Sequence, residues 1–284
     1  MRQDVYYQRG APDPVLDESL VMEIVHKYAP EAKTIKRIDE SGGEARTYHV
    51  DANITLKVQR PQQLRMSTSL EKEAFFLKQL EKNTDVNVPR VLGYGRHGTV
   101  EYTCMTRIPG ICVKNATLSD DELKAVLLEL GQTLRKIHGI DQKPFAGNKL
   151  FPCDDPPDLK ERLLRRAVTA IQKKIESAGQ AKTDAAIKAV ERELEAIKNT
   201  GSFVALHVNP AKTHTFVDEK NHRYTGLIDF GDAYIGHPVF DFWRWPVPER
   251  KTLLKGYTTA APVSNEFMII LETANAIDDI ADNL

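Results

Sequence analysis

The chain has 284 residues, enough for two lobes with a substantial core, and its 41% hydrophobic and 28% charged residues are ordinary for a globular protein. The formal net charge of −1 provides no general attraction to nucleic acid or to anionic membranes. No apolar stretch reaches the roughly 18 residues that cross a bilayer, and the N-terminal sequence lacks the apolar core of a signal peptide. We therefore expect a cytoplasmic protein, monomeric or homodimeric, with no nucleic-acid or membrane partner.

The first third of the sequence predicts a small lobe that is rich in β-structure. Alternating β-prone residues on both sides of a polar turn predict a hairpin, and apolar residues at helical spacing predict a helix before it and another after it. A proline and a glycine at positions 109 and 110 end this pattern, so we place the lobe boundary there. The predicted elements are a helix over 18–28, strands over 47–50 and 54–58, a helix over 69–81 and a strand over 100–105.

The remainder predicts a mainly helical lobe. A capping box at 119–122 begins a long helix, and two further amphipathic helices follow the loop at 144–157. Two short strands, at 215–217 and 224–228, flank a polar turn. We therefore predict an α+β fold with two lobes, a β-rich one over residues 1–108 and a helical one over 109–284, with a cleft between them.

A lysine in an apolar strand and a glutamate in the next helix form the first candidate pair. Lys57 shares a strand face with Thr55, while its neighbours Leu56 and Val58 face the other way. Glu73 lies on or beside the apolar face of the following helix, where a carboxylate is costly unless it is paired. We predict that Glu73 pairs with Lys57, an arrangement that positions a lysine on nucleotide phosphates.

A second group of candidates lies about 150 residues further along the chain. Asp229 follows an aliphatic strand and precedes a glycine, and a carboxylate in such a place is well suited to hold Mg²⁺. His207, Asn209 and His214 lie shortly before a short apolar strand. A polar loop with structural histidines is one interpretation. A zinc site formed by His207, His214 and Asp229 is another, although no H-x-x-x-H helical spacing supports it.

The turn at Gly42 and Gly43 has two interpretations as well. Glycines let main-chain N–H groups approach a phosphate closely, and the turn lies between a helix and a strand. Two adjacent glycines are more often a plain hairpin turn. The sequence leaves both open.

Taken in order, these segments resemble the aminoglycoside phosphotransferase and choline-kinase-like family, relatives of the protein kinases. The family pattern H-G-D-x-x-x-x-N, or its variant ending in His, is similar to the segment from His207 to His214, and the pattern I-D-[FW]-G is similar to 228–231. Other segments that are similar to motifs of the family are Glu73-Ala74, the stretch 88–91, the hinge at 105–110, and the glycine and aspartate of 236–241. The resemblance spans roughly residues 20–257.

The resemblance implies a protein-kinase-like two-lobed fold and an ATP-dependent phosphotransferase that acts on a hydroxyl of a small molecule. It implies ATP, or GTP, together with Mg²⁺. It also implies site residues: Asn209 and His207 as catalytic residues; Gly42, Gly43, Lys57, Glu73, Met105 and Arg107 at the nucleotide; and His214 and Asp229 at the metal.

Asn209 departs from the family pattern, because it stands at the position of the catalytic aspartate. An amide has a similar shape and can orient a hydroxyl, but it cannot act as a base. The alternatives are therefore a catalytically impaired ATP-binding pseudokinase or regulatory module, or nucleotidyl transfer. The acceptor is open, and a cationic acceptor would be served by the acidic residues near the C-terminus.

Overall fold

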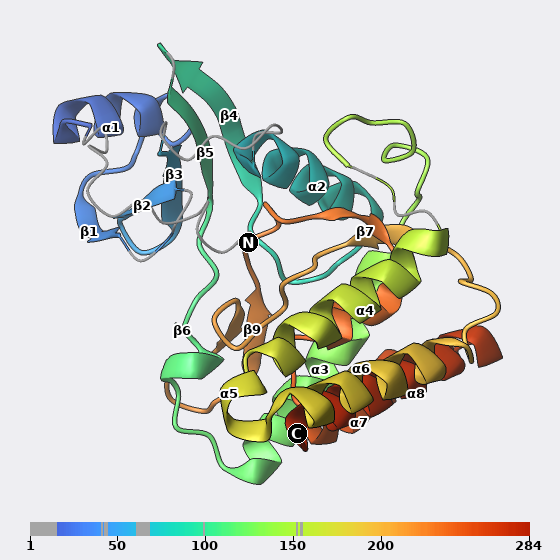
Figure 1. The fold of residues 1–284 in the computed structure, drawn as a ribbon. Helices are drawn as coiled ribbons and strands as arrows, with labels where there is room; N and C mark the ends of the chain where they lie inside the picture. The colour runs from blue at the N-terminus through green and yellow to red at the C-terminus, as the bar shows by residue number, and fades with distance from the viewer. Residues whose placement is uncertain are drawn as a thin grey trace. The chain divides into compact units, whose positions relative to one another are not determined.

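The computed structural model describes residues 16–40, 42, 45–60, 69–98, 100–151, 153 and 156–284 (Figure 1). The chain forms two compact units, and each is assembled from segments that are distant in the sequence. The first unit consists of Met1–Val126, Ile140–Phe151 and His207–Ala233. The second consists of Leu127–Gly139, Pro152–Leu206 and Tyr234–Leu284.

A five-stranded antiparallel sheet is the largest element of the first unit, with the strand order β1-β2-β3-β5-β4. Strand β3 lies in the middle of this order, and its apolar residues are buried on the face where helix α1 packs against them. The chain turns from β2 into β3 at Asp51, whose φ is 48° and whose carboxylate accepts two main-chain N–H groups. The elements are α1 (Glu18–His26), β1 (Ile35–Asp39), β2 (Ala45–Val50), β3 (Ile54–Gln59), β4 (Val91–His97) and β5 (Val100–Thr106).

Helix α2 (Ser69–Asn83) packs on the same sheet, against β4 and β5. Leu70, Phe76, Leu77 and Leu80 form its buried side, as the helical spacing of these residues predicts. The other side of the helix is mostly polar, so the packing orients α2 and fixes where Glu73 lies.

A smaller sheet has three strands in the order β6-β8-β9, and the candidate residues of the late segment flank it, because His214 precedes β8 and Asp229 follows β9. Its strands are antiparallel and only two to four residues long. Gly226 is required here because a Cβ at this position would lie 2.6 Å from the main-chain oxygen of Asn87. The elements are β6 (Ile111–Cys112), a 3₁₀ turn η2 (Val113–Asn115), β8 (Thr215–Val217) and β9 (Tyr224–Leu227).

The second unit is helical. Helices α4, α6 and α8 pack on one another through apolar faces that include Leu163, Val190 and Ile277. A two-stranded ribbon pairs β7 with β10. Helix α3 contributes its first residues to the first unit and its remainder to this one. The elements are α3 (Asp120–His138), α4 (Pro156–Gln172), α5 (Ile175–Ala178), α6 (Gln180–Leu194), β7 (Val204–Leu206), β10 (Tyr234–Gly236), η3 (Pro238–Phe242), α7 (Val247–Tyr257) and α8 (Asn265–Asp282).

The predicted α+β fold with a β-rich N-terminal part and a helical C-terminal part is confirmed. Strands β1 and β4 were not predicted. The charged pattern of β1 reflects an edge strand with exposed residues, and β4 contains two glycines that are usually read as turn signals. The division of the chain at residues 108 and 109 remains a prediction. No helix in the described residues has the length and apolarity to span a membrane.

Candidate functional site

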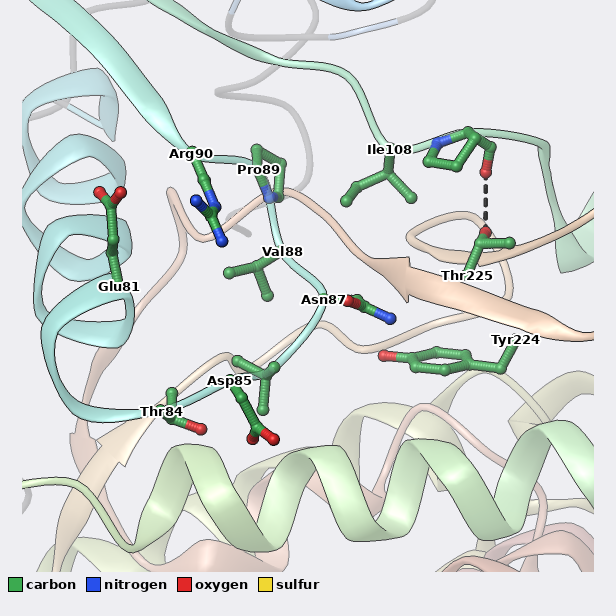
Figure 2. Close-up of a pocket in the computed structure, with 12 residues that line it drawn as sticks. Glu81, Thr84, Asp85, Asn87, Val88, Pro89, Arg90, Ile108, Tyr224 and Thr225 are labelled. Carbon is green, nitrogen blue, oxygen red and sulfur yellow. Dashed lines mark hydrogen bonds between the residues drawn. The ribbon is translucent and has the colours of Figure 1, made fainter.

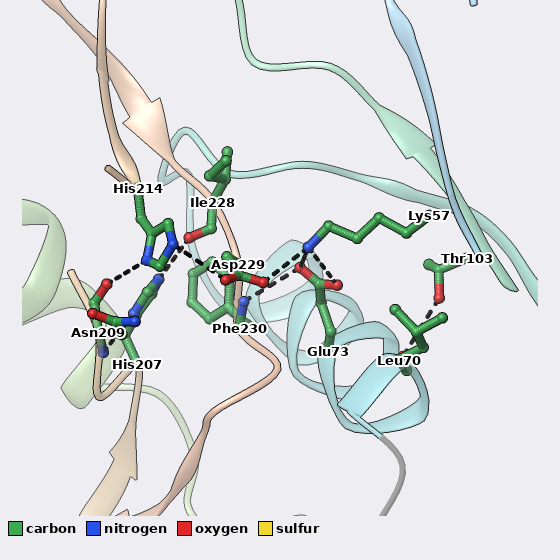
Figure 3. Close-up of polar contacts among 10 residues, drawn as sticks. All are labelled: Lys57, Leu70, Glu73, Thr103, His207, Asn209, His214, Ile228, Asp229 and Phe230. Carbon is green, nitrogen blue, oxygen red and sulfur yellow. Dashed lines mark hydrogen bonds and ion pairs between the residues drawn. The ribbon is translucent and has the colours of Figure 1, made fainter. Parts of the chain in front are cut away.

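The ammonium group of Lys57 lies between two carboxylates (Figure 3). Its Nζ donates to Glu73 Oε1 and Oε2, at 2.8 and 2.9 Å, and to Asp229 Oδ1 at 3.0 Å. The exposed side-chain fractions are 14% for Lys57, 1% for Glu73 and 40% for Asp229. The predicted pair is therefore formed, and Asp229 is the member of the group that is open to a ligand.

Neighbouring strands and helices hold these three residues in place. Lys57 pairs with Thr47 on one side and Thr103 on the other, so its main chain is fixed within the sheet. Glu73 also accepts the main-chain N–H of Phe230, at 3.3 Å, which ties helix α2 to the residue after Asp229. Asp229 has a φ of 73°, a conformation that costs energy in a non-glycine residue and is common at functional sites.

Electrostatics in this cluster favour charged Lys57 and charged Asp229. Burial opposes the charge of Lys57, but the carboxylates of Asp229 and Glu73 outweigh it and raise the pKa of the lysine. Burial also opposes ionisation of Asp229, yet Lys57 and then His214 outweigh it and lower the pKa of this carboxyl group. Burial raises the pKa of Glu73, and Lys57 counteracts that rise.

His207 holds the loop that contains the other candidates. Its Nδ1 accepts the main-chain N–H of Asn209 at 3.1 Å, and its Nε2 donates to the main-chain oxygen of Ile228 at 2.9 Å. These contacts assign one proton to Nε2 and leave both ring nitrogens satisfied by main chain. The ring, which is fully buried, packs on Phe230 with 4.5 Å between the ring centroids. His207 thus fastens the loop to the segment that bears Asp229.

Val208 lies between His207 and Asn209 with a φ of 75°. The left-handed region is sterically unfavourable for L-residues and most of all for a β-branched one. The hydrogen bonds of the two flanking residues hold this conformation.

His214 is oriented by a main-chain contact. Its Nδ1 donates to the main-chain oxygen of Asn209 at 2.7 Å, and its Nε2 lies 3.3 Å from Asp229 Oδ2. The main-chain oxygen can only accept, so Nδ1 carries a proton and Nε2 is the ring atom that faces the carboxylate. Nε2 and Asp229 Oδ2 are therefore placed to share one cation, a proton or a metal ion.

This donor set fits a divalent cation. Asp229 supplies carboxylate oxygens, and His214 supplies an imidazole nitrogen that Mg²⁺ uses less readily than Mn²⁺ does. Among the described residues, no group of three or more His, Cys, Asp or Glu side chains could hold a metal ion by itself. A cation here would therefore complete its shell with water and with ligand phosphates, as is usual for Mg²⁺.

The main chain of Asn209 is held at both its N–H and its C=O, whereas its side-chain amide makes no hydrogen bond within the described part of the chain. The amide therefore retains its full capacity to donate and to accept. Of the sequence-predicted residues, the structure brings Lys57, Glu73, Asp229 and His214 into one connected cluster, with Asn209 and His207 joined to it through main-chain contacts.

The predicted nucleotide-contacting residues outside this cluster have local roles. A Cβ at Gly42 would lie 2.7 Å from the main-chain oxygen of Ala45, so a side chain at residue 42 would clash with that oxygen. Gly43 lies outside the described residues. Met105 is buried within β5, and the N–H of Arg107 donates to Asn53. Their contact with a nucleotide stays a prediction.

An aromatic core beneath Glu73 and Asp229 was not predicted. Phe76 contacts Phe145 and Phe230 edge to face, with centroid separations of 5.1 and 5.2 Å. Phe230 is the residue after Asp229, so this core supports the turn that presents the carboxylate. The phenylalanines at 145 and 151 lie in a segment that was predicted as a loop. Their large apolar side chains were the one feature of the sequence that could have indicated a role in packing.

A cavity of about 430 Å³ lies elsewhere in the first unit (Figure 2). Its walls are the end of α2, the segment 84–90, the residues after β5 and the start of β9. Thr225 donates to the main-chain oxygen of Pro109 across one edge, at 2.7 Å. None of the residues of the Lys57 cluster lines it.

Comparisons with known proteins find a family model and similar solved structures. The family model described as the phosphotransferase enzyme family matches residues 34–261. Comparison with curated protein sequences gives no match. The chain is similar in structure to the streptomycin–ATP ternary complex of APH(2″)-IIa, with a TM-score of 0.61 and 20% identity over 94% of this chain and 90% of that chain. The GDP complex of wild-type aminoglycoside 2′-phosphotransferase-IIIa gives a TM-score of 0.64 and 14% identity over 93% of this chain and 90% of that chain. The apoenzyme of macrolide 2′-phosphotransferase MphH from Brachybacterium faecium gives a TM-score of 0.58 and 17% identity over 91% of this chain and 90% of that chain.

Proposed function

Because the chain belongs to the phosphotransferase enzyme family, we propose that it binds a nucleoside triphosphate and transfers the γ-phosphoryl group to a hydroxyl of a small molecule. The observation that carries the proposal is the connected set Glu73–Lys57–Asp229–His214. It places a buried cation and an oriented imidazole on the two oxygens of one partly exposed carboxylate. Phosphoryl transfer requires these components on the nucleotide side.

Lys57 is the residue that we assign to the α- and β-phosphates. Its charge is secured by Glu73, which is too buried to serve a ligand itself. The ammonium group carries three protons, and its hydrogen-bond partners in the structure are the carboxylates of Glu73 and Asp229. A nucleotide phosphate would replace Asp229 as a partner, which releases Asp229 Oδ1 for another ligand.

Asp229 and His214 are the residues that would hold a divalent cation. When bound, such a cation neutralises charge that develops on the phosphate oxygens. The chain contributes the fixed direction of both donors, because the main-chain oxygen of Asn209 orients His214 and the lysine orients Asp229. His207 acts as a positioning residue that fastens the loop of Asn209 to Ile228.

Asn209 is the residue that we assign to the acceptor. Its amide oxygen accepts the hydrogen bond of the acceptor hydroxyl and so orients the attacking oxygen. In the transfer, the acceptor oxygen forms a bond to the γ-phosphorus, the bond from phosphorus to the leaving nucleoside diphosphate breaks, and the hydroxyl proton passes to the transferred phosphate or to water. The amide cannot take that proton, so positioning carries the reaction.

Two measurements on the full chain test the proposal. Thermal unfolding with ADP, ATP, GDP or GTP, each with Mg²⁺, Mn²⁺ or EDTA, should show a metal-dependent rise in Tm for at least one nucleotide. Release of the nucleoside diphosphate should then increase when a hydroxyl compound from a metabolite and antibiotic panel is added. A chain that no nucleotide stabilises would contradict the proposal.

A second candidate function, nucleotide binding without transfer, is favoured by one observation. Asn209 removes the general base, which contributes about 10²- to 10⁴-fold in rate where it is present. The two functions differ in a measurable way. Stabilisation by nucleotide without turnover, in the native chain and also after Asn209→Asp, would favour the binding module.

A further inference from the structure

The cavity in the first unit, with a volume of about 430 Å³, has the size of a small-molecule pocket and a frame that the protein forms by itself (Figure 2). The main-chain oxygen of Asn87 accepts the N–H of Leu227 at 3.0 Å, which joins the segment before β4 to strand β9. At another edge, Thr225 donates to the main-chain oxygen of Pro109. The walls therefore do not need a ligand in order to form.

Two oppositely charged side chains line this cavity without pairing. Glu81 is near the end of α2, and Arg90 directly precedes β4. Both are exposed, and neither side chain makes a hydrogen bond or an ion pair within the described part of the chain. Exposed charges without a partner are common on protein surfaces. Here, however, a carboxylate and a guanidinium border one cavity and leave room for a ligand that contacts both.

The fold fixes where both charged residues are attached. The N–H of Arg90 donates to Thr106 Oγ1 at 2.8 Å, and its main-chain oxygen accepts the N–H of Thr106 at 2.9 Å. Glu81 follows Leu80, which is fully buried and holds this part of α2 against the sheet. A ligand that contacts both charges would therefore join α2 to the end of β5.

An apolar wall lies beside these charges. It includes Val88, which is half-buried, and Ile108, which has 8% of its surface exposed. Figure 2 shows the ring of Tyr224 at the far side of the cavity from Glu81. A second carboxylate of the lining, Asp85, has interactions of its own within the chain, so Glu81 is the carboxylate that a ligand would meet. One side of the cavity thus presents both charges, and the wall next to it suits an apolar group.

We propose that this cavity binds a small zwitterion, an α-amino acid with an apolar side chain. Arg90 binds its carboxylate, Glu81 binds its ammonium group, and Val88 and Ile108 pack against its side chain. A ligand with a single charge would attract one of the two protein charges and be repelled by the other. None of the residues of the Lys57 cluster lines the cavity, so the inference goes beyond the proposed function and does not depend on it.

Four ligands that share parts of one framework test the proposal with the full chain. Phenylalanine carries both charges and a ring, 2-phenylethylamine lacks the carboxylate, 3-phenylpropanoate lacks the ammonium group, and glycine lacks the ring. Calorimetry without nucleotide gives the Kd of each. We expect phenylalanine to bind at least about three-fold more tightly than each of the other three, because single contacts to exposed charges are weak.

Two substitutions assign the charges separately. Glu81→Gln should abolish the preference for phenylalanine over 3-phenylpropanoate and retain the preference over 2-phenylethylamine. Arg90→Gln should do the converse. Glu23→Gln and Arg37→Gln make the same changes at exposed positions of α1 and β1, and these controls should leave both preferences intact. Urea midpoints close to that of the native chain establish that each variant is folded.

Three results would overturn the inference. The first is a native chain that binds neither phenylalanine nor leucine, its aliphatic counterpart. The second is a set of preferences that Glu81→Gln and Arg90→Gln leave unchanged, or that the two control variants change equally. The third is displacement of phenylalanine by a non-hydrolysable ATP analogue with Mg²⁺, because it would place the amino acid at the Lys57 cluster instead of in this cavity.

Discussion

The ammonium nitrogen of Lys57 lies 3.0 Å from Asp229 Oδ1, although the two residues are 172 positions apart in the chain. The contact joins the central strand of the five-stranded sheet to the turn that follows β9. The lysine therefore occupies one oxygen of the carboxylate that we assign to the cation. Under the proposed function, we expect a nucleotide and a cation to exchange this direct contact for contacts to phosphate.

Lys57→Met should abolish nucleotide binding and also destabilise the fold. The change leaves Glu73, with 1% of its side chain exposed, without its cation, and breaking one side of a buried pair costs about 3–5 kcal/mol. Urea unfolding measures the stability loss, and nucleotide-dependent Tm shifts measure binding. Lys36→Met, on the exposed face of β1, is the control and should change neither quantity. A Lys57→Met chain that nucleotide still stabilises would remove Lys57 from the site.

Asn209→Asp should increase phosphoryl transfer by about 10²-fold or more, because a carboxylate restores a general base against the acceptor hydroxyl. Nucleotide binding should change little, since Asn209 contacts His207 and His214 through its main chain. Single-turnover transfer rates with an acceptor from the panel check this. Asn209→Ala, which neither orients nor accepts, should fall below the native chain. Equal rates in all three chains would show that residue 209 does not meet the acceptor.

His214→Asn should shift the metal preference from Mn²⁺ toward Mg²⁺, because an amide oxygen suits the harder cation better than an imidazole does. The readout is the nucleotide-dependent Tm shift across a titration of each metal, with Mn²⁺ binding followed independently by electron paramagnetic resonance. His97→Asn, in the exposed end of β4, is the control. An unchanged ratio of the two metal affinities in His214→Asn would exclude His214 as a ligand.

Val208→Gly should leave the folded state as stable as the native chain or stabilise it by up to about 1 kcal/mol. Glycine adopts a φ of 75° without the cost of roughly 1–2 kcal/mol that a side chain brings, and this gain offsets the greater entropy of glycine in the unfolded chain. Val86→Gly, in a loop position that lacks a positive φ, should instead lose stability. Urea midpoints of both variants measure the change in stability. If Val208→Gly lost as much stability as Val86→Gly, the backbone at Val208 would not be strained.

Stability should fall between pH 6.5 and pH 4 because of His237. Burial, and then neighbouring His138, lower the pKa of His237 to about 4. In this window the unfolded chain binds a proton at His237 and the folded chain does not, so the contribution is complete above pH 6.5 and is lost as the pH falls. The loss amounts to about 3 kcal/mol. Urea unfolding at a series of pH values measures it, and His237→Gln should flatten the slope whereas His97→Gln should not.

The sequence alone identified Lys57, Glu73 and Asp229 as a candidate group, and it predicted the pairing of Lys57 with Glu73 that the structure contains. A carboxylate on the apolar side of a helix is costly without a cation beside it, so the position of Glu73 predicted a cationic partner. The position of an aspartate at the end of an aliphatic strand led to the prediction of a metal ligand. These inferences depend on local periodicity, which the sequence records directly. The two-part α+β architecture followed from the same kind of pattern.

Only the tertiary structure decided how the late segment is held. The main-chain oxygen of Asn209 orients the ring of His214, and the main-chain oxygen of Ile228 orients that of His207. Contacts to main-chain atoms cannot be predicted from the pattern of side chains in a sequence. The left-handed conformation of Val208 could not be predicted from the sequence either, because valine is not a residue typical of that conformation. The sequence supplied the charged groups, and the packing of distant segments decided which of them face one another and which protons they carry.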